Sequence, residues 1–365
     1  MHATGARFVP PHCPRSDCRF HRSPVGWRWV RHGWFTRRAA PQRIARFRCV
    51  DCGHTFSTQT FSTTYWLRRP DVLLPTAHRL LACSGFRQLA REARCSHTTA
   101  LRHAARLGRH ALLCLHALRP SRPVAEPVVI DGFESFAFSQ YHPLHLHLVA
   151  GAESHFAYAF THSILRRKGR MTERQRRRRS ALEARHGRPD PRAIELDMAQ
   201  ALQLAAPHPQ PLRVRSDEHD DYPRALRRLS GYATVHERTN SREARTAGNP
   251  LFPVNRLDLL LRHNSANHKR ETIAFSKRHQ SVVERAAWLL LWQNWSKPFS
   301  ERHGGGTPAM RAGYATRPIA IAELLRQRRF PERVGLPEIW ARYYRGEVRT
   351  VRIANERRYR FKLAR

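Results

Sequence analysis

Two cysteine pairs near the N-terminus constrain the fold of this 365-residue chain more than any other feature. Four residues separate Cys13 from Cys18, and two separate Cys49 from Cys52, with a glycine directly after the second pair. Thiolates at these spacings can converge on one tetrahedral Zn²⁺, and the glycine permits the tight turn that such a site needs. The aromatic-rich segment between the pairs is expected to form a hairpin. Residues 10–66 are therefore predicted to be a zinc ribbon, with free thiols as the alternative.

The other three cysteines, Cys83, Cys95 and Cys114, are isolated within helical patterns. An odd total of seven cysteines, four of them in tight pairs, favours a metal site with additional buried thiols over a disulfide framework. The N-terminal region that holds the two pairs has little apolar core, so it needs a cross-link such as a bound metal ion to fold.

A large positive charge indicates a polyanionic partner. The chain has 66 Lys and Arg against 28 Asp and Glu, so its net charge is 66 − 28 = +38. Nucleic acid neutralises such a charge, and the guanidinium group suits both phosphate oxygens and guanine edges. A membrane surface is the competing anion, but the sequence has no run of 18 or more apolar residues. We expect a cytoplasmic, nucleoid-associated protein without membrane contact.

Residues 70–120 are predicted to form a helix-turn-helix domain. Residues 84–93 have apolar side chains at helical spacing, and Ser96 is suited to cap a second helix that runs to about residue 110. A polar and basic outer face is expected on that helix, with Thr98, Thr99, Arg102, His103 and Arg106. Thr98, Thr99 and Arg102 are the candidates for contacts with base edges, and Arg106 is a further DNA-binding candidate. An ordinary helical hairpin is the alternative.

Residues 124–302 alternate strand and helix patterns. Apolar and β-branched segments predict strands at residues 128–131, 145–149, 154–160, 212–217 and 232–236. Helical patterns occupy residues 191–205 and 223–229 and begin again at residue 254. The resulting order, β-β-β-α-β-α-β-α, predicts an α/β fold with flanking helices.

Two acidic residues end predicted strands in this otherwise basic chain. Asp131 closes the first strand and Asp217 the fourth, so their carboxylates can lie side by side. Carboxylates so placed hold Mg²⁺ as hard oxygen ligands, and two such ions support phosphoryl transfer. Taken singly, Asp131 is equally well explained as a turn residue at the end of a strand. Asp217 is equally well explained as a helix cap.

The chain resembles the insertion-sequence DDE transposases in three segments. Residues 129–136 (Val-Ile-Asp-Gly-Phe-Glu-Ser-Phe) look like the first catalytic segment, and residues 215–219 (Arg-Ser-Asp-Glu-His) with Tyr222-Pro223 look like the second. The third corresponds to residues 249–258 (Asn-Pro-Leu-Phe-Pro-Val-Asn-Arg-Leu-Asp) and 268–277 (His-Lys-Arg-Glu-Thr-Ile-Ala-Phe-Ser-Lys). The same relatives carry a zinc ribbon and a helix-turn-helix in this order, so the resemblance covers residues 10–302.

This resemblance implies an RNase H-like mixed sheet with flanking helices in residues 124–302. It also implies catalysis with Mg²⁺ or Mn²⁺ on double-stranded DNA, both transposon ends and target, by a homo-oligomer assembled on that DNA. Asp131 and Asp217 correspond to the first two acids of the family. The family places a glutamate on the helix after the fifth strand, where this chain has Asn255.

The third acid is therefore open on the sequence alone. Asp258 lies one helical turn after Asn255 on nearly the same face, and it is our first choice as catalytic residue and magnesium ligand. Glu271 and Glu284 are the other candidates, and the absence of a third acid is the remaining possibility. Without it, strand cleavage would be weak or absent.

Two segments lie outside these motifs. Residues 165–192 form a basic insertion, either a solvated segment or a contact to the DNA backbone. Residues 303–365 contain three consecutive glycines near their start, at 304–306, and form a basic C-terminal extension without an assigned role. Two rival functions also stay open. One is a non-catalytic DNA-binding protein, such as a regulator or decayed transposase, and the other is an RNase H-like nuclease or resolvase that recognises DNA shape.

Overall fold

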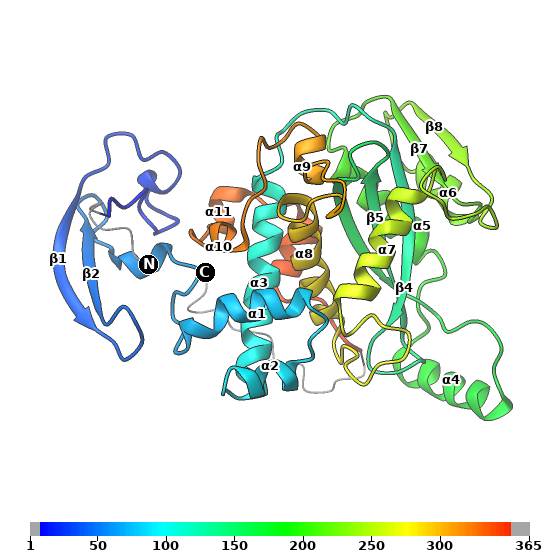
Figure 1. The fold of residues 1–365 in the computed structure, drawn as a ribbon, viewed down its shortest axis with the longest axis horizontal. Helices are drawn as coiled ribbons and strands as arrows, with labels where there is room; N and C mark the ends of the chain where they lie inside the picture. The colour runs from blue at the N-terminus through cyan, green and yellow to red at the C-terminus, as the bar shows by residue number, and fades with distance from the viewer. Residues whose placement is uncertain (1–7, 352–365) are drawn as a thin grey trace.

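The computed structural model describes residues 8–351, which form a small sheet at one end, a helical layer and a larger α/β region (Figure 1). The small sheet is antiparallel with the order β1-β2-β3, formed by Trp29–Thr36, Arg43–Cys49 and Thr55–Ser57. Short 3-10 helices, Arg19–His21 and Thr58–Phe61, flank it. The predicted hairpin is thus present as β1 and β2.

The helical layer contains Pro70–Val72 as a 3-10 helix, α1 (Leu73–Leu81), α2 (Phe86–Glu92) and α3 (His97–Ala117). As predicted, the Ser96 side chain accepts a hydrogen bond from the Thr99 backbone and caps α3. The helix extends well past residue 110, because leucines in its second half continue the buried face that packs along α8. At Gly108 the two helices approach so closely that a Cβ would lie 2.4 Å from the Glu284 carbonyl oxygen.

The larger sheet has five strands in the order β6-β5-β4-β7-β8. They are β4 (Val128–Phe136), β5 (Pro143–Gly151), β6 (Ala157–Ile164), β7 (Leu212–Ser216) and β8 (Thr234–Arg238). β4, β5 and β6 pair antiparallel, whereas β7 lies parallel to β4 and β8 parallel to β7. The sheet is therefore mixed, and the region is α/β as the sequence predicts. This topology is compatible with an RNase H-like fold.

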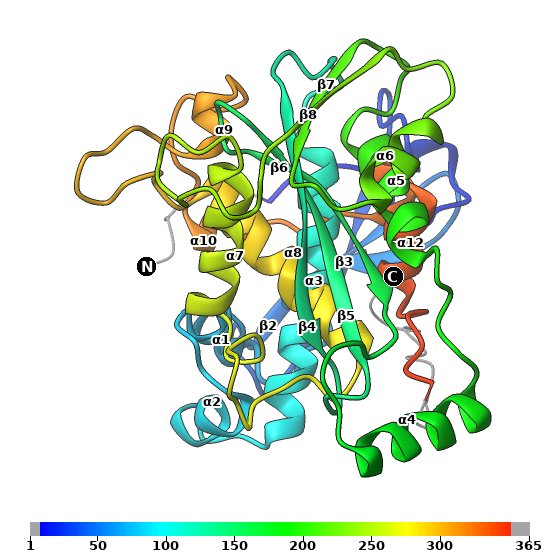
Figure 2. The ribbon, with the colours of Figure 1, turned by 90° about the vertical axis from the view of Figure 1, so that its right-hand side faces the viewer.

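Helices cover both faces of this sheet (Figure 2). α5 (Ala193–Ala205) packs on β5 and β6 from one side, and α7 (Phe252–Asn264) packs on β4 and β5 from the other. α6 (Asp221–Arg227) joins β7 to β8, and α8 (His279–Trp295) lies between the sheet and α3. α7 ends at Asn264, and a loop separates it from α8.

The C-terminal segment is not a separate extension within the described residues. Its short helices are α9 (Pro308–Arg311), α10 (Ile321–Leu324), α11 (Pro331–Val334) and α12 (Glu338–Arg345). Trp340 packs on Phe160 of β6 and donates to its carbonyl oxygen at 3.0 Å. Phe330 joins the cluster of buried aromatics and cysteines in the ribbon. The segment thus ties the ribbon to the main core, although the predicted basic tail at 352–365 lies outside the described residues.

The predicted insertion at 165–192 contains α4 (Glu173–His186), a helix without a single buried residue. It projects away from the body of the molecule (Figure 1). Within residues 8–351, no helix combines the length and the apolar character needed to cross a bilayer.

Candidate functional site

The register of β4 and β7 brings two acids next to each other. Val128 pairs with Val214, and Val129 pairs with Arg215, in a parallel arrangement. Continuing this register by two residues sets Asp131 beside Asp217, which directly follows β7. Asp131 is in the middle of β4 rather than at the end of a strand, because β5 pairs with β4 along its whole length. The sequence-based prediction of the strand end is therefore wrong.

Asp131 is held in place by two hydrogen bonds to its Oδ1. The Gly132 backbone N–H donates at 2.7 Å, and the Tyr222 hydroxyl, at the start of α6, donates at 3.2 Å. Burial raises the pKa of Asp131, and the neighbouring charge of Asp217 raises it further, against the lowering effect of these hydrogen bonds. The sequence motif contains Tyr222 but gives no sign of this supporting role.

Asp258 reaches the same region from α7. The guanidinium of Arg262, on α7, lies 4.7 Å from the ring centroid of Phe133, on β4. Side chains alternate between the two faces of a strand, so every second residue of β4 faces α7. Asp131 shares the parity of Phe133 and therefore points toward the same helix. Burial, and then the charge of Asp131, raises the pKa of Asp258 well above its usual range, although Arg262 and Arg245 oppose this shift. The two carboxylates thus lie within electrostatic range of each other.

One oxygen of this third carboxylate has no internal partner. Asp258 Oδ1 is buried and accepts no hydrogen bond from the residues that the structure describes. A buried carboxylate oxygen without a donor is costly, and a cation removes that cost. Asp258 is therefore the strongest point in this region for a bound metal ion.

The other two candidates for the third acid lie elsewhere. Glu271 is exposed in the loop between α7 and α8. Glu284 is buried at the contact between α8 and α3, where Gln280 donates to it at 3.0 Å. Asn255 precedes Asp258 by one turn of α7 and is half-buried. Of these residues, Asp258 is the one that the structure brings to Asp131.

Within residues 8–351, the three acids are not grouped closely enough to hold a single metal ion. Among residues 8–351, only the four cysteines form a group of three or more ligating side chains with all donor atoms within 4.8 Å. Two-metal sites hold their ions about 3.5–4 Å apart, so their ligands are spread over a wider space than the ligands of a single ion. Carboxylate oxygens are the ligands that Mg²⁺ and Mn²⁺ prefer. The chemistry of the three carboxylates therefore suits hard divalent ions.

The cysteine cluster matches a structural zinc site. Cys13 Sγ lies 3.6 Å from Cys52 Sγ, and all four sulfurs, including those of Cys18 and Cys49, lie within 4.8 Å of one another. Tetrahedral coordination with Zn–S bonds of about 2.3 Å separates sulfurs by roughly 3.8 Å, which agrees with this spacing. The four sequence-predicted cysteines are thus brought together in a cluster that can bind zinc.

The surroundings of Cys49 favour its thiolate form. Burial alone would raise its pKa, but backbone N–H groups of Cys52 and Asp51 and the indole N–H of Trp27 outweigh burial and lower the pKa to about 7. The indole nitrogen lies 3.2 Å from the sulfur. Thiolates rather than thiols ligate metals, so this environment suits a zinc ligand.

The helix-turn-helix residues separate into two groups. Thr98 and Arg102 are exposed and Thr99 is half-buried near the N-terminus of α3, where they can meet a DNA groove. His103 and Arg106 do not face outward as predicted. His103 is 2% exposed, and Arg106 is half-buried with its guanidinium donating to the Thr63 carbonyl oxygen at 2.9 Å. They differ because the end of the predicted ribbon segment, at Thr63, packs over this part of α3.

Comparisons with known proteins give little further information. No family model matches the chain, and no curated protein matches it. Among solved structures, one match is a chain of the cryo-EM structure of a simian T-cell lymphotropic virus intasome in complex with PP2A regulatory subunit B56 gamma. The two share 16% sequence identity over 68% of this chain and 76% of that chain, with a TM-score of 0.27. A likeness this weak carries no argument about fold or function.

Proposed function

We propose that this protein is a DNA strand-cleaving and strand-joining enzyme of the DDE transposase type. The observation that carries the proposal is that Asp131 lies within electrostatic range of both Asp217 and Asp258, and that Asp258 has a buried and unpartnered oxygen. The sequence resemblance of residues 10–302 to insertion-sequence transposases supports the same reading, as does the net charge of +38.

In this proposal Asp131, Asp217 and Asp258 hold two Mg²⁺ or Mn²⁺ ions. Bound ions of this kind activate a water molecule or a 3′-hydroxyl and stabilise the leaving oxygen of the phosphodiester. Gly132 and Tyr222 fix one oxygen of Asp131, which leaves its other oxygen for a metal ion.

The surrounding arginines neutralise the DNA strand at this site. Arg245 and Arg262 lie within electrostatic range of Asp258 and can bind the phosphates that flank the scissile bond. Thr98, Thr99 and Arg102 on α3 read base edges of the terminal inverted repeats, and the zinc-bound ribbon adds a second DNA-binding element. The active form is a homo-oligomer that joins two transposon ends to target DNA.

The test is a cleavage assay on DNA that flanks the gene and carries its inverted repeats. Mg²⁺ should support nicking at the repeat ends, whereas Ca²⁺ should support binding without cleavage. Asp131→Asn and Asp217→Asn should abolish nicking and preserve DNA binding. Glu218→Gln is the matched control, because Glu218 is an exposed acid next to Asp217. Binding without nicking under any metal would overturn the enzymatic proposal.

A second candidate function is that of a non-catalytic DNA-binding protein. Asn255 stands where the resembling family has its glutamate, and Asp258 has a shorter side chain than glutamate. This candidate predicts a footprint confined to one inverted repeat with no metal-dependent product. The same assay therefore separates the two functions.

A further inference from the structure

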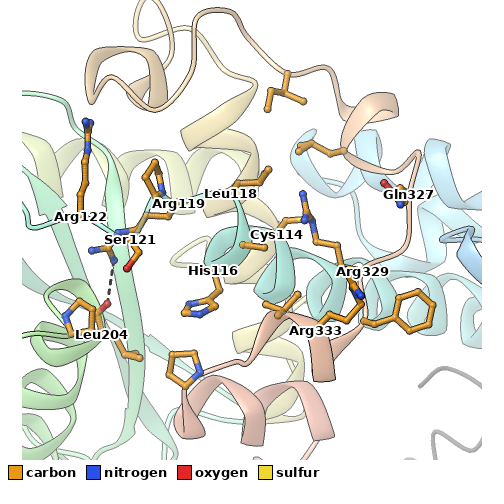
Figure 3. A pocket seen from close by; sticks show the side chains of 18 of the residues that line it. Cys114, His116, Leu118, Arg119, Ser121, Arg122, Leu204, Gln327, Arg329 and Arg333 are labelled. Atoms are coloured by element: carbon orange, nitrogen blue, oxygen red, sulfur yellow. Dashed lines mark hydrogen bonds between the residues drawn. The ribbon is translucent and has the colours of Figure 1, made fainter. Parts of the chain in front are cut away.

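A large cavity lies where the ribbon, the end of α3 and the C-terminal segment meet (Figure 3). Its volume is about 1020 Å³. The walls come from residues 11–12 of the ribbon, 114–123 at and after the end of α3, 203–210 after α5, and 319–337. None of the three acids lines it, so it is separate from the candidate active site.

The charge around this cavity is strongly one-sided. Six arginines line it, namely Arg119, Arg122, Arg326, Arg328, Arg329 and Arg333. The lining has a single carboxylate, Glu323, which is engaged by Arg317 at 2.8 Å. None of the six guanidinium groups forms an ion pair with any residue between 8 and 351. So many cations around one space, without a direct ion pair among the described residues, favour a bound anion.

Several of these arginines are held rigidly by neutral partners. Arg119 donates to the Leu204 carbonyl oxygen at 3.2 Å and stacks over the ring of Tyr158, and Figure 3 shows its bond to Leu204 at the wall. Arg333 donates to the carbonyl oxygens of His21 and Arg22. Carbonyl groups orient a guanidinium without neutralising it, so the positive charge is fixed and available.

Arg328 gives the clearest sign of a missing ligand. It is 7% exposed, and its guanidinium lies between the rings of Tyr65 and Phe330, at 5.0 and 4.8 Å from their centroids. Its Nη1 donates to the Thr60 carbonyl oxygen at 3.2 Å, whereas the buried Nη2 has no partner among the described residues. A buried donor without an acceptor is expensive unless a ligand supplies one.

Two more arginines add positive charge next to this cavity. A second, small cavity next to the first is lined by Arg106, Arg109, Arg328 and Arg329. Burial, and then the charges of Arg109 and Arg328, lowers the pKa of Arg106 to about 10. These groups repel one another, and an anion in the cavity would relieve that repulsion.

We propose that this cavity binds the phosphodiester backbone of a single DNA strand. This inference rests on the proposed function, because it takes DNA as the ligand. A volume of about 1020 Å³ is comparable to that of small-ligand pockets, roughly 300–1,000 Å³, so the cavity can enclose a few nucleotides of one strand but not a duplex. Its arginines match the pattern of single-strand sites, in which cations follow the backbone, and the partly exposed His116 is the lining ring that a base can reach.

The position of the cavity makes it a second DNA contact. The base-reading candidates lie at the N-terminal end of α3, and the cavity lies at its C-terminal end. A helix of 21 residues is about 31 Å long, so the two contacts engage different parts of the DNA. The cavity therefore receives a strand that has separated from the duplex beyond the sequence read by α3.

The test compares salt-dependent binding of single-stranded and duplex DNA by the full chain. Arg122→Gln combined with Arg326→Gln removes two exposed cavity charges. Each lost phosphate contact lowers the salt slope for single strands by about 0.7, so affinity at about 0.1 M salt should fall roughly 25-fold. Arg213→Gln combined with Arg302→Gln is the control, because both residues are exposed and lie outside the cavity.

A second variant blocks the cavity without changing its charge. Ala117 is an exposed lining residue, so Ala117→Trp fills space while leaving every arginine in place. It should weaken single-strand binding while duplex binding and the melting temperature stay unchanged. Thermal unfolding of every variant separates loss of the site from loss of the fold.

The outcomes distinguish this inference from the proposed function. Equal single-strand binding by the cavity variants and the control would overturn the cavity proposal and leave transposase activity standing. Normal single-strand binding through the cavity without nicking at repeat ends would overturn the enzymatic proposal alone. Stabilisation by inorganic triphosphate, together with no single-strand binding, would make the cavity a site for small polyanions and overturn the assignment to DNA.

Discussion

The two candidate metal sites of this protein are built in opposite ways. In the ribbon, four sulfurs lie within 4.8 Å of one another and come from two short stretches of chain. In the sheet region, three carboxylates come from β4, β7 and α7 and form a more open group. A closed set of four thiolates suits one structural ion, whereas open carboxylates leave coordination positions for water and substrate. We therefore expect the first site to hold a fold together, and we propose the second for chemistry.

Removal of zinc should give the largest effect of all. Cys49→Ser or a strong chelator should unfold the ribbon, because structural zinc contributes about 10–16 kcal/mol in comparable small domains. The sheet region should stay folded, since none of the four clustered cysteines belongs to its core. Metal analysis and limited proteolysis would report both results. Cys95→Ser is the control, because Cys95 lies outside the cluster. Full zinc content in Cys49→Ser would show that this cluster is not the zinc site.

Loss of the third acid should abolish catalysis while leaving the fold intact. Asp258→Ala should lower Mg²⁺-dependent nicking by at least about 100-fold, because one metal ligand is removed. Asp258→Glu should retain part of the activity, since it keeps a carboxylate and restores the longer side chain. Circular dichroism should show no change in either variant.

Glu271→Ala provides the matched comparison for this assignment. Glu271 is exposed and should tolerate the substitution with unchanged nicking. If Glu271→Ala were inactive and Asp258→Ala active, the site would use the loop after α7, and the assignment of the third acid would be wrong.

The difference between the sites also explains what the sequence can predict. Cysteine spacing within each pair is a local signal, so the sequence alone predicts the cluster. Local patterns likewise predict the strands and the Ser96 cap. The neighbourhood of Asp131 and Asp217 depends instead on strand order and register, which the sequence indicates only indirectly, through acids at predicted strand ends and the resemblance to transposases.

Long-range packing accounts for the errors. The sequence places Arg106 on an exposed helix face, but Thr63, near the end of the predicted ribbon segment, lies over that face and accepts its hydrogen bond. The sequence also predicts a basic extension over residues 303–351, yet Trp340 and Tyr343 belong to the main core. The arginine-lined cavity is equally hidden from sequence patterns, because its wall combines four distant segments of chain. No local pattern encodes contacts of this kind.

Hydrogen bonds around the ligands should matter less than the ligands themselves. Trp27→Phe removes the indole N–H that donates to Cys49, and Tyr222→Phe removes the hydroxyl that donates to Asp131. Each substitution should weaken metal affinity about tenfold, because such partners orient the ligand and tune its charge. Zinc competition with a chromogenic chelator and Mg²⁺ titration of nicking would measure the two effects. The effects should be confined to their own sites, and a loss of zinc affinity in Tyr222→Phe would contradict this independence.

The smallest effect concerns stability in the absence of metal. Burial and neighbouring charge raise the folded-state pKa of Asp131 and Asp258 above the unfolded value of about 3.9. The folded state therefore binds more protons than the unfolded state above that pH, and its stability falls as the pH rises through this window. Asp258→Asn removes one of the two carboxylates, so it should stabilise the metal-free protein at neutral pH by about 1 kcal/mol.

Magnesium should make the wild type more stable than Asp258→Asn, the reverse of their order without metal. Saturating Mg²⁺ stabilises whichever protein binds it, so the wild type should gain stability and Asp258→Asn should gain little. Thermal unfolding with chelator and with Mg²⁺, from about pH 4 to pH 8, would reveal the crossing. A destabilised Asp258→Asn in chelator would mean that the carboxylate already has a native partner. The sheet site would then resemble the ribbon, as a fold-supporting cluster, and the contrast between the two sites would fail.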